Sequence, residues 1–272
     1  MKRRDFLTAS GTGLAALTTT ATFAADDPRN RLPLLRRRTL EKEFIEVRKY
    51  TVKDIEKRTQ LIGILDQALI PALNRQGLKP VGVFIPVEKE EKYALNVFVA
   101  IPHKTSATFI NVNTKLLTDN KYRKDAASIF ETDSKNPVYT DCETFFLKNF
   151  DTVPILETPK LGPDRVFELR LYRSFNIERN AAKIKMFDQG GEVPLFREVG
   201  LNPIFFGDVI AGKRQPSLIY MIGCPSLEKH AEAWKTFINH PKWQKLKNDP
   251  EYADTATEIE RVVLIPSAGS QV

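Results

Sequence analysis

Two stretches of the 272-residue chain decide the fold: Glu46-Val47-Arg48-Lys49-Tyr50, and Glu168-Leu169-Arg170-Leu171-Tyr172 in the second half. Each is followed by a Gly-Leu-x-Pro segment, which begins at Gly77, 27 residues after the first tyrosine, and at Gly200, 28 residues after the second. A further proline stands 25 residues beyond each glycine. Such constant spacing indicates two copies of one unit of about 105 residues, joined by a proline-rich segment.

Hydrophobic periodicity predicts the same order of elements in both copies. A strand leads into a long helical stretch, where apolar residues from Ile55 to Leu73 keep roughly helical spacing. Gly77 and Gly200 stand where a helix should end, and a proline that follows each prevents continuation. Two strands, a second helical segment and a closing strand complete each copy, in the β-α-β-β-α-β order of a ferredoxin-like unit. The predicted strands are 44–50, 81–87, 95–101 and 143–150, then 166–172, 204–210, 218–224 and 258–265.

The middle strands of both copies are apolar almost without interruption, as in Val97–Ile101 and Leu218–Ile222. Continuous apolar strands are typical of sheets that are buried on both faces. Helices cover only one face of a ferredoxin-like sheet, so the other face needs a second sheet, which the other copy provides. The predicted fold class is therefore α+β, with two tandem ferredoxin-like units packed sheet to sheet as an intrachain α/β barrel that carries its helices outside.

The first strand of each copy separates into an apolar and a polar face, since alternate strand residues share a face. We expect the apolar set to meet the helices and the polar set to point into the shared interior. The apolar set is Ile45 and Val47 with Phe167, Leu169 and Leu171. The polar set is Glu46, Arg48 and Tyr50 with Glu168, Arg170 and Tyr172, and Tyr220 is a further candidate.

Two interpretations of the polar set remain open. The Glu-x-Arg pairs neutralise each other and fix the register between the sheets, because partly buried charges must be paired. Alternatively, Arg48 and Arg170 bind the carboxylate or phosphate of a small molecule, and the tyrosines add hydrogen bonds.

The N-terminus predicts export. Residues 1–24 resemble a bacterial twin-arginine signal, with Arg3-Arg4 followed by Phe6-Leu7, a weakly apolar stretch and small residues before Ala25. Residues 25–42 form a basic tether that carries +3 of the net charge of +7, and the body that follows is nearly neutral. We expect a periplasmic or secreted protein without a nucleic-acid partner or a membrane span, while further oligomerisation stays open. The predicted domains are 43–153 and 165–268, with a linker at 154–164.

The sequence contains few motifs for catalysis or for metal or cofactor binding. No Ser/His/Asp spacing, glycine-rich phosphate loop or metal-ligand cluster is present, so no catalytic residue, metal or required cofactor is predicted. His230 is the single candidate for a haem ligand. A disulfide between Cys142 and Cys224 stays open, with inert buried thiols as the alternative.

The same residues resemble the NIPSNAP family of the dimeric α/β-barrel superfamily. The resemblance rests on Phe167-Glu168-Leu169-Arg170-Leu171-Tyr172, Gly200-Leu201, Trp234-Lys235-Thr236-Phe237 and Pro241-Lys242-Trp243. It covers residues 165–268 best, and the first copy is similar to a diverged member. The resemblance implies the barrel fold but no reaction, because the superfamily includes antibiotic-biosynthesis-type monooxygenases, haem-handling proteins and binding modules.

The sequence thus predicts an exported NIPSNAP-like protein that binds a small polar or anionic organic molecule in the barrel interior. A monooxygenase-like or haem-handling oxidoreductase is the first alternative. A non-catalytic protein-interaction module is the second.

Overall fold

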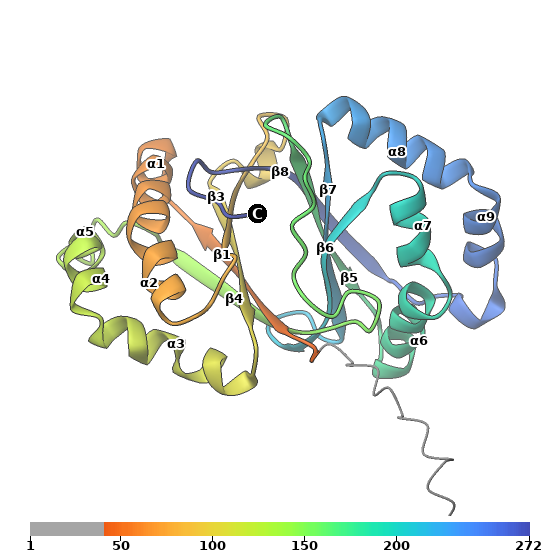
Figure 1. The fold of residues 1–272 in the computed structure, drawn as a ribbon, viewed down its shortest axis with the longest axis horizontal. Helices are drawn as coiled ribbons and strands as arrows, with labels where there is room; N and C mark the ends of the chain where they lie inside the picture. Colours follow the sequence, from red (N-terminus) through yellow and green to blue (C-terminus); the bar gives the residue numbers. More distant parts are fainter. Residues whose placement is uncertain (1–40) are drawn as a thin grey trace, which may run out of the picture. The chain divides into compact units, whose positions relative to one another are not determined.

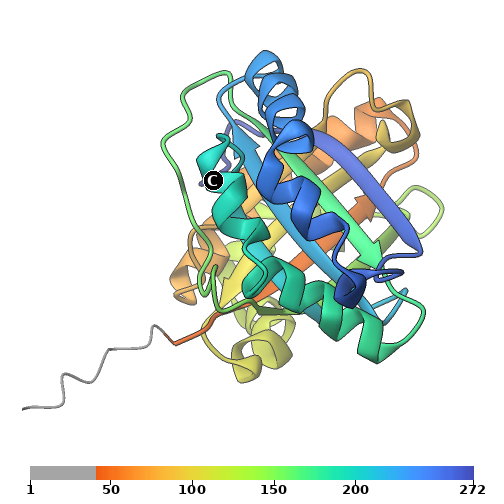
Figure 2. The same cartoon turned by 90° about the vertical axis from the view of Figure 1, so that its right-hand side faces the viewer.

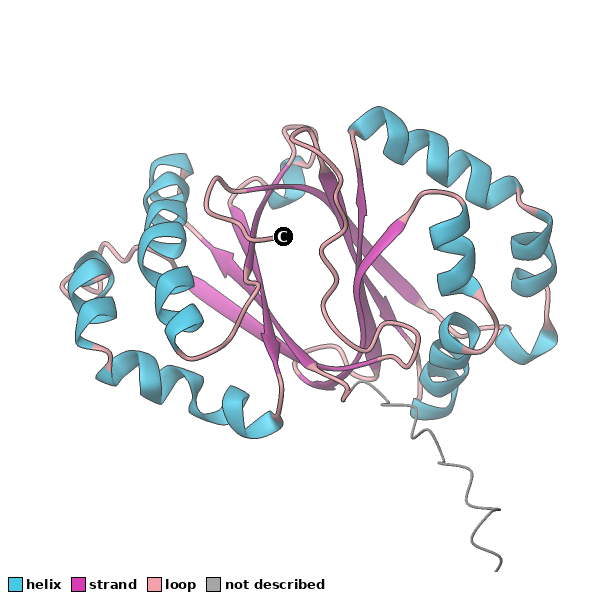
Figure 3. Ribbon diagram, viewed as in Figure 1, coloured by secondary structure: helices cyan, strands magenta, loops and turns pink. Residues whose placement is uncertain are grey.

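The strands of residues 41–272, the part that this computed structural model describes, form one closed antiparallel barrel (Figures 1 and 3). Around the barrel their order is β1-β3-β2-β8-β5-β7-β6-β4. The predicted export signal and the tether up to residue 40 lie outside the described residues. The strands are β1 Phe44–Thr51, β2 Gly82–Pro86, β3 Asn96–His103, β4 Asp141–Asn149, β5 Val166–Arg173, β6 Asn202–Ala211, β7 Ser217–Cys224 and β8 Glu258–Pro266.

All eight predicted strands are present, and their bounds differ from the prediction by two residues at most. Two seams join the first four strands to the last four: β2 pairs with β8, and β4 pairs with β6. The sheets are therefore hydrogen-bonded at both margins, which the sequence did not predict. This closure leaves no strand edge exposed, and residues 41–272 belong to a single compact unit.

The helices surround the barrel on its outside, as predicted (Figure 1). Figure 2 shows the helices of the second half, in teal and blue, lying across the strands behind them. The first group is α1 Ile55–Ile64, the π-helical turn η2 Leu65–Leu69, α2 Ile70–Arg75, α3 Ser106–Thr118, α4 Asn120–Asp125 and α5 Ala127–Phe130. The second group is α6 Ile177–Asp188, α7 Glu192–Glu198, α8 Leu227–Asn239 and α9 Pro241–Lys247, and the short turns are η3 Glu91–Tyr93 and η4 Pro250–Tyr252.

Local sequence sets the ends of these helices. Ser226 caps α8 by accepting a hydrogen bond from the Lys229 backbone N–H, and Thr105 caps α3 in the same way. Gly77 and Gly200 adopt φ values of 80° and 89° just after α2 and α7, where the sequence predicts helix ends.

The faces of the first strands are the reverse of the prediction. Ile45 and Val47 of β1 belong to the apolar cluster that fills the barrel, together with Phe167, Leu169 and Leu171 of β5. The polar set points outward, toward the helices. Strand alternation assigns residues to a common face but does not say what covers that face. The barrel interior offers a buried charge few partners, whereas the helices carry polar side chains that can pair with it.

Candidate functional site

The two polar triplets lie between the sheet and the helices, and each is internally paired. Arg48 donates from Nε to Glu46 at 2.5 Å and from Nη1 to the Tyr50 hydroxyl at 3.4 Å. Arg170 repeats the arrangement, with Nε 2.9 Å from Glu168 and Nη1 3.1 Å from the Tyr172 hydroxyl. The i, i+2 spacing thus brings each glutamate and arginine together within one strand. Beyond this common core, the two triplets differ in their surroundings.

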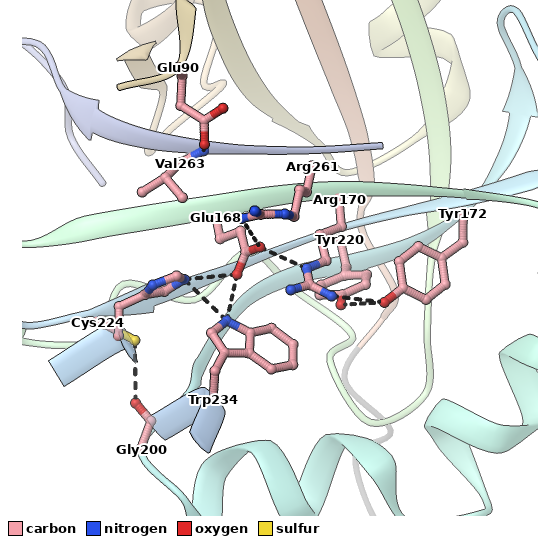
Figure 4. A network of polar contacts seen from close by, with 11 residues as sticks. Glu90, Glu168, Arg170, Tyr172, Gly200, Tyr220, Cys224, Trp234, Arg261 and Val263 are labelled. Carbon is pink, nitrogen blue, oxygen red and sulfur yellow. Dashed lines mark hydrogen bonds and ion pairs between the residues drawn. The ribbon is translucent and has the colours of Figure 1, made fainter. Parts of the chain in front are cut away.

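In the second half, α8 completes the site around Glu168 (Figure 4). The outer oxygen of this carboxylate, Oε2, lies 2.8 Å from His230 Nε2 and accepts a 2.6 Å hydrogen bond from Trp234 Nε1. The guanidinium of Arg170 stacks on the Trp234 ring, 3.9 Å from its centroid. His230 and Trp234 are four residues apart, so the capped helix presents both on one face.

The charges of this cluster stabilise each other. Burial opposes ionisation of Glu168, but the His230 hydrogen bond and the Arg170 charge outweigh it and lower the pKa of the carboxyl. The Tyr172 hydroxyl lies 3.2 Å from that of Tyr220, which is fully buried. Burial raises the pKa of Tyr220 well above its ordinary value, so this hydroxyl stays protonated. Tyr220 thus contacts Tyr172 of the polar set, and its role in binding a ligand stays a prediction.

A second buried ion pair borders the cluster. Lys183 of α6 lies 3.2 Å from Glu192 of α7, and its ammonium is 5.4 Å from the centroid of the Tyr172 ring. Burial raises the pKa of Glu192, and the opposing charge of Lys183 offsets only part of that effect. Sequence analysis did not select this pair, because Lys183 and Glu192 lie in different helices.

Replacing Glu192 with Gln should change how stability depends on pH. A carboxyl with a raised pKa in the folded state favours folding below its ordinary value of 4.5, and this contribution is lost as pH rises through the folded pKa. The stability of wild type relative to Glu192→Gln should thus fall as pH rises above about 4.5, as measured by urea unfolding in acid and at neutral pH. Glu198→Gln in the same helix is the control and should show the opposite slope, because Lys242 lowers the pKa of Glu198. A difference in unfolding free energy between wild type and Glu192→Gln that did not change with pH would contradict the expectation.

A cavity of about 440 Å³ opens beside this cluster, and we call it the C-terminal cleft. Both tryptophans of the chain line it. Its walls are Glu168, Arg170, Tyr172, Glu192, His230, Ala231, Trp234, Phe237, Ile238, Trp243 and Arg261. The cleft therefore combines aromatic walls with a guanidinium group.

In the first half, the corresponding triplet of Glu46, Arg48 and Tyr50 has different hydrogen-bond partners. Glu46 is held by His103, whose fully buried ring places Nε2 2.9 Å from the carboxylate. The Nη2 group of Arg48 donates to Asn113 of α3 at 3.2 Å. Within residues 41–272, no acceptor lies within hydrogen-bonding distance of the corresponding Nη2 of Arg170. Each nitrogen of the Arg48 guanidinium thus has a hydrogen-bond acceptor in the protein, while Nη2 of Arg170 has none within residues 41–272.

The environment of His230 does not fit an axial haem ligand. Its Nε2 atom is engaged by Glu168 and by the Trp234 indole, 3.1 Å away, so this nitrogen does not present a free lone pair. Cys142 and Cys224 are both free thiols, on β4 and β7. Burial raises the pKa of Cys224 to about 12, which keeps it protonated.

Two further features are absent from residues 41–272. No group of three or more His, Cys, Asp or Glu side chains is arranged to hold a metal ion. No helix in this range is long and apolar enough to cross a bilayer.

Comparison with known proteins establishes the fold. No family model and no curated protein matches the chain. A candidate monooxygenase from Lactobacillus acidophilus NCFM has a similar structure, with a TM-score of 0.57 and 11% identity over 83% of this chain and 94% of that one. An anthrone oxidase-like protein gives a TM-score of 0.52 and 11% identity over 84% and 93%. These likenesses show a barrel of the dimeric α/β-barrel type, within one chain.

A NIPSNAP family protein from Agrobacterium tumefaciens is also among the structural neighbours. It is 22% identical, with a TM-score of 0.36, and the match covers 40% of this chain and 98% of that protein.

Proposed function

We propose that this protein binds a small, planar, anionic organic molecule in the C-terminal cleft. The observation that carries the proposal is that Nη2 of Arg170 has no acceptor within residues 41–272, whereas Nη2 of Arg48 donates to Asn113. The position differs from the predicted one, because both arginines lie between sheet and helices and not inside the barrel. For Arg48 the contacts favour the structural interpretation, in which the pair fixes local packing.

The cleft has the chemistry for such a ligand. A guanidinium held in place by Glu168 and stacked on Trp234 is oriented before the ligand arrives, so little side-chain entropy is lost on binding. Trp243 and Phe237 supply flat apolar surface for a ring. The volume of about 440 Å³ lies in the lower part of the range of roughly 300–1,000 Å³ found for small-molecule sites. A compact aromatic carboxylate therefore matches both the charge and the size of the cleft.

Tryptophan fluorescence tests the proposal directly, because both tryptophans line the cleft. Titration with benzoate and phenylacetate should give a saturable change in emission. Arg170→Met should weaken binding at least tenfold, since a hydrogen bond to a charged group contributes about 1.5–3 kcal/mol. Arg48→Met is the matched control and should leave the affinity unchanged. No saturable change in wild type, or equal losses in the two variants, would reject the proposal.

An oxidoreductase is the second candidate, and the names of two structural neighbours support it, a candidate monooxygenase and an anthrone oxidase-like protein. In such a protein the cleft would hold the substrate beside Tyr172 and Trp234, which both line it, without haem on His230. Oxygen uptake with anthrone, faster with wild type than with Arg170→Met, would favour this candidate. The same rate in the presence and absence of protein would exclude anthrone as a substrate.

We also propose that the chain is an exported, tandem duplicated relative of NIPSNAP proteins with two ferredoxin-like units. The twin-arginine pattern and the matched spacings of the two halves support this proposal. Replacing Arg3 and Arg4 with Lys should keep the protein in the cytoplasm of a bacterial host. Unchanged export would argue against the twin-arginine route.

A further inference from the structure

The barrel interior is closed at one end by the last residues of the sequence shown. The Gln271 and Ser270 side chains accept hydrogen bonds from the backbone of Val81, just before β2, and of Val83 in β2, and Val272 packs into the interior cluster. Arg165, which directly precedes β5, donates to the Val272 carbonyl at 3.2 Å. The interior is therefore filled at the end where β5 begins.

At the other end of β5 the interior opens into a cavity of about 330 Å³, which we call the barrel mouth. Its floor consists of buried apolar side chains from six strands, among them Val47, Phe98, Phe145, Leu171, Ile219 and Val262. These side chains offer a ligand no hydrogen-bond donor or acceptor, so the floor accepts only an apolar group.

The rim of the mouth carries charges, with cations in excess. The lining residues include Lys49, Lys92, Lys213, Arg214 and Arg261 against Glu143 and Glu260. Glu260 is occupied by Arg214 at 2.6 Å and by Lys92 at 3.5 Å. Glu143 lies directly across the β1–β4 ladder from Lys49 but pairs with Lys213 at 3.1 Å.

Lys49 is therefore left without an ion-pair partner on the rim. Within residues 41–272, no carboxylate lies within ion-pair distance of its ammonium, which is 6.0 Å from the centroid of the Tyr93 ring. Lys49 follows Val47 by two positions on β1, so both side chains share the interior face. A half-buried lysine without a counter-charge thus stands directly above the apolar floor.

We propose that the barrel mouth is a second ligand site, which binds an amphiphilic carboxylate such as a medium-chain fatty acid. The alkyl chain lies on the apolar floor, and the carboxylate pairs with Lys49 at the rim. This site is separate from the C-terminal cleft, and among their lining residues the two share Arg261 alone. Each methylene that enters the floor should raise the affinity by roughly two- to fourfold.

Calorimetric titration of the full chain with hexanoate, octanoate and decanoate, below their micelle-forming concentrations, tests the proposal. We expect one site per chain and an affinity that rises along the series. Lys49→Gln should weaken decanoate binding by about five- to tenfold, since an ion pair at a half-buried position is lost, but should leave 1-decanol binding unchanged. Lys148→Gln, an exposed lysine on β4, is the matched control.

Two readouts separate this site from the cleft. Decanoate should not alter tryptophan fluorescence, and Arg170→Met should not alter decanoate affinity. The proposal is overturned if wild type does not bind decanoate, if Lys49→Gln and Lys148→Gln behave alike, or if Arg170→Met abolishes decanoate binding. If benzoate and phenylacetate did not bind in the C-terminal cleft, the decanoate measurements would still test the barrel mouth.

Discussion

Replacing Glu168 with Leu is expected to lower the free energy of unfolding by about 3–5 kcal/mol, because it leaves a buried charge without its partner. Glu168 is fully buried and serves Arg170, His230 and Trp234 at once. Leucine cannot accept any of these hydrogen bonds. The guanidinium and the indole N–H would then be desolvated without compensation.

Urea unfolding at neutral pH measures this loss, and Glu232→Leu on α8 is the control. Glu232 is an exposed partner of Lys229, so its replacement should cost no more than about 1 kcal/mol. The difference between wild type and Glu168→Leu should shrink in acid. A carboxyl with a lowered pKa stabilises the fold above its ordinary pKa, and the contribution disappears as pH falls through the folded value. Equal stability of Glu168→Leu and wild type at neutral pH would show that the network adds nothing.

Phe84→Ala is expected to destabilise the protein by about 3–5 kcal/mol through the cavity that it leaves in the barrel. Phe84 is fully buried on β2, next to the β2–β8 seam. Its ring lies 5.0 Å from that of Phe167 on β5, in an edge-to-face arrangement. The contact joins the first half of the chain to the second inside the barrel.

Thermal or urea unfolding of Phe84→Ala checks the expectation. Phe175→Ala, the same substitution at an exposed position, is the control. The Phe175 side chain is 61% exposed, so its loss should cost less than about 1 kcal/mol. If the two variants lost similar stability, the apolar interior would not be what holds the halves together.

The strands, their order and the helix ends could be read from the sequence because local signals define them. Apolar runs predict buried strands, and Gly77 and Gly200 mark the left-handed ends of helical segments. The need to cover a second sheet face then predicts the barrel. Hydrogen bonding across the β2–β8 and β4–β6 seams was not predictable, because no local pattern specifies which strands meet at a margin.

The candidate site was predictable only in part. The Glu-x-Arg-x-Tyr spacing correctly groups Glu168, Arg170 and Tyr172, because strand alternation is a local property. In the sequence, Trp234 stood out only as part of the resemblance to the NIPSNAP family. Its spacing of four residues from His230 was the available signal, since it places a polar ring atom beside an indole N–H on one face.

The sequence by itself determined which side chains share a face of a strand or helix, because backbone periodicity alone sets that grouping. Only the tertiary structure decided which group faces the barrel and which faces the helices, and hence that Arg170 borders the cleft while Lys49 borders the barrel mouth. The barrel interior and the helix layer, which cover the two faces of each sheet, are both largely apolar. Which face of a first strand points inward therefore depends on where its buried charges find partners. Those partners, such as His230 for Glu168, lie many residues away and meet it only after the chain has folded.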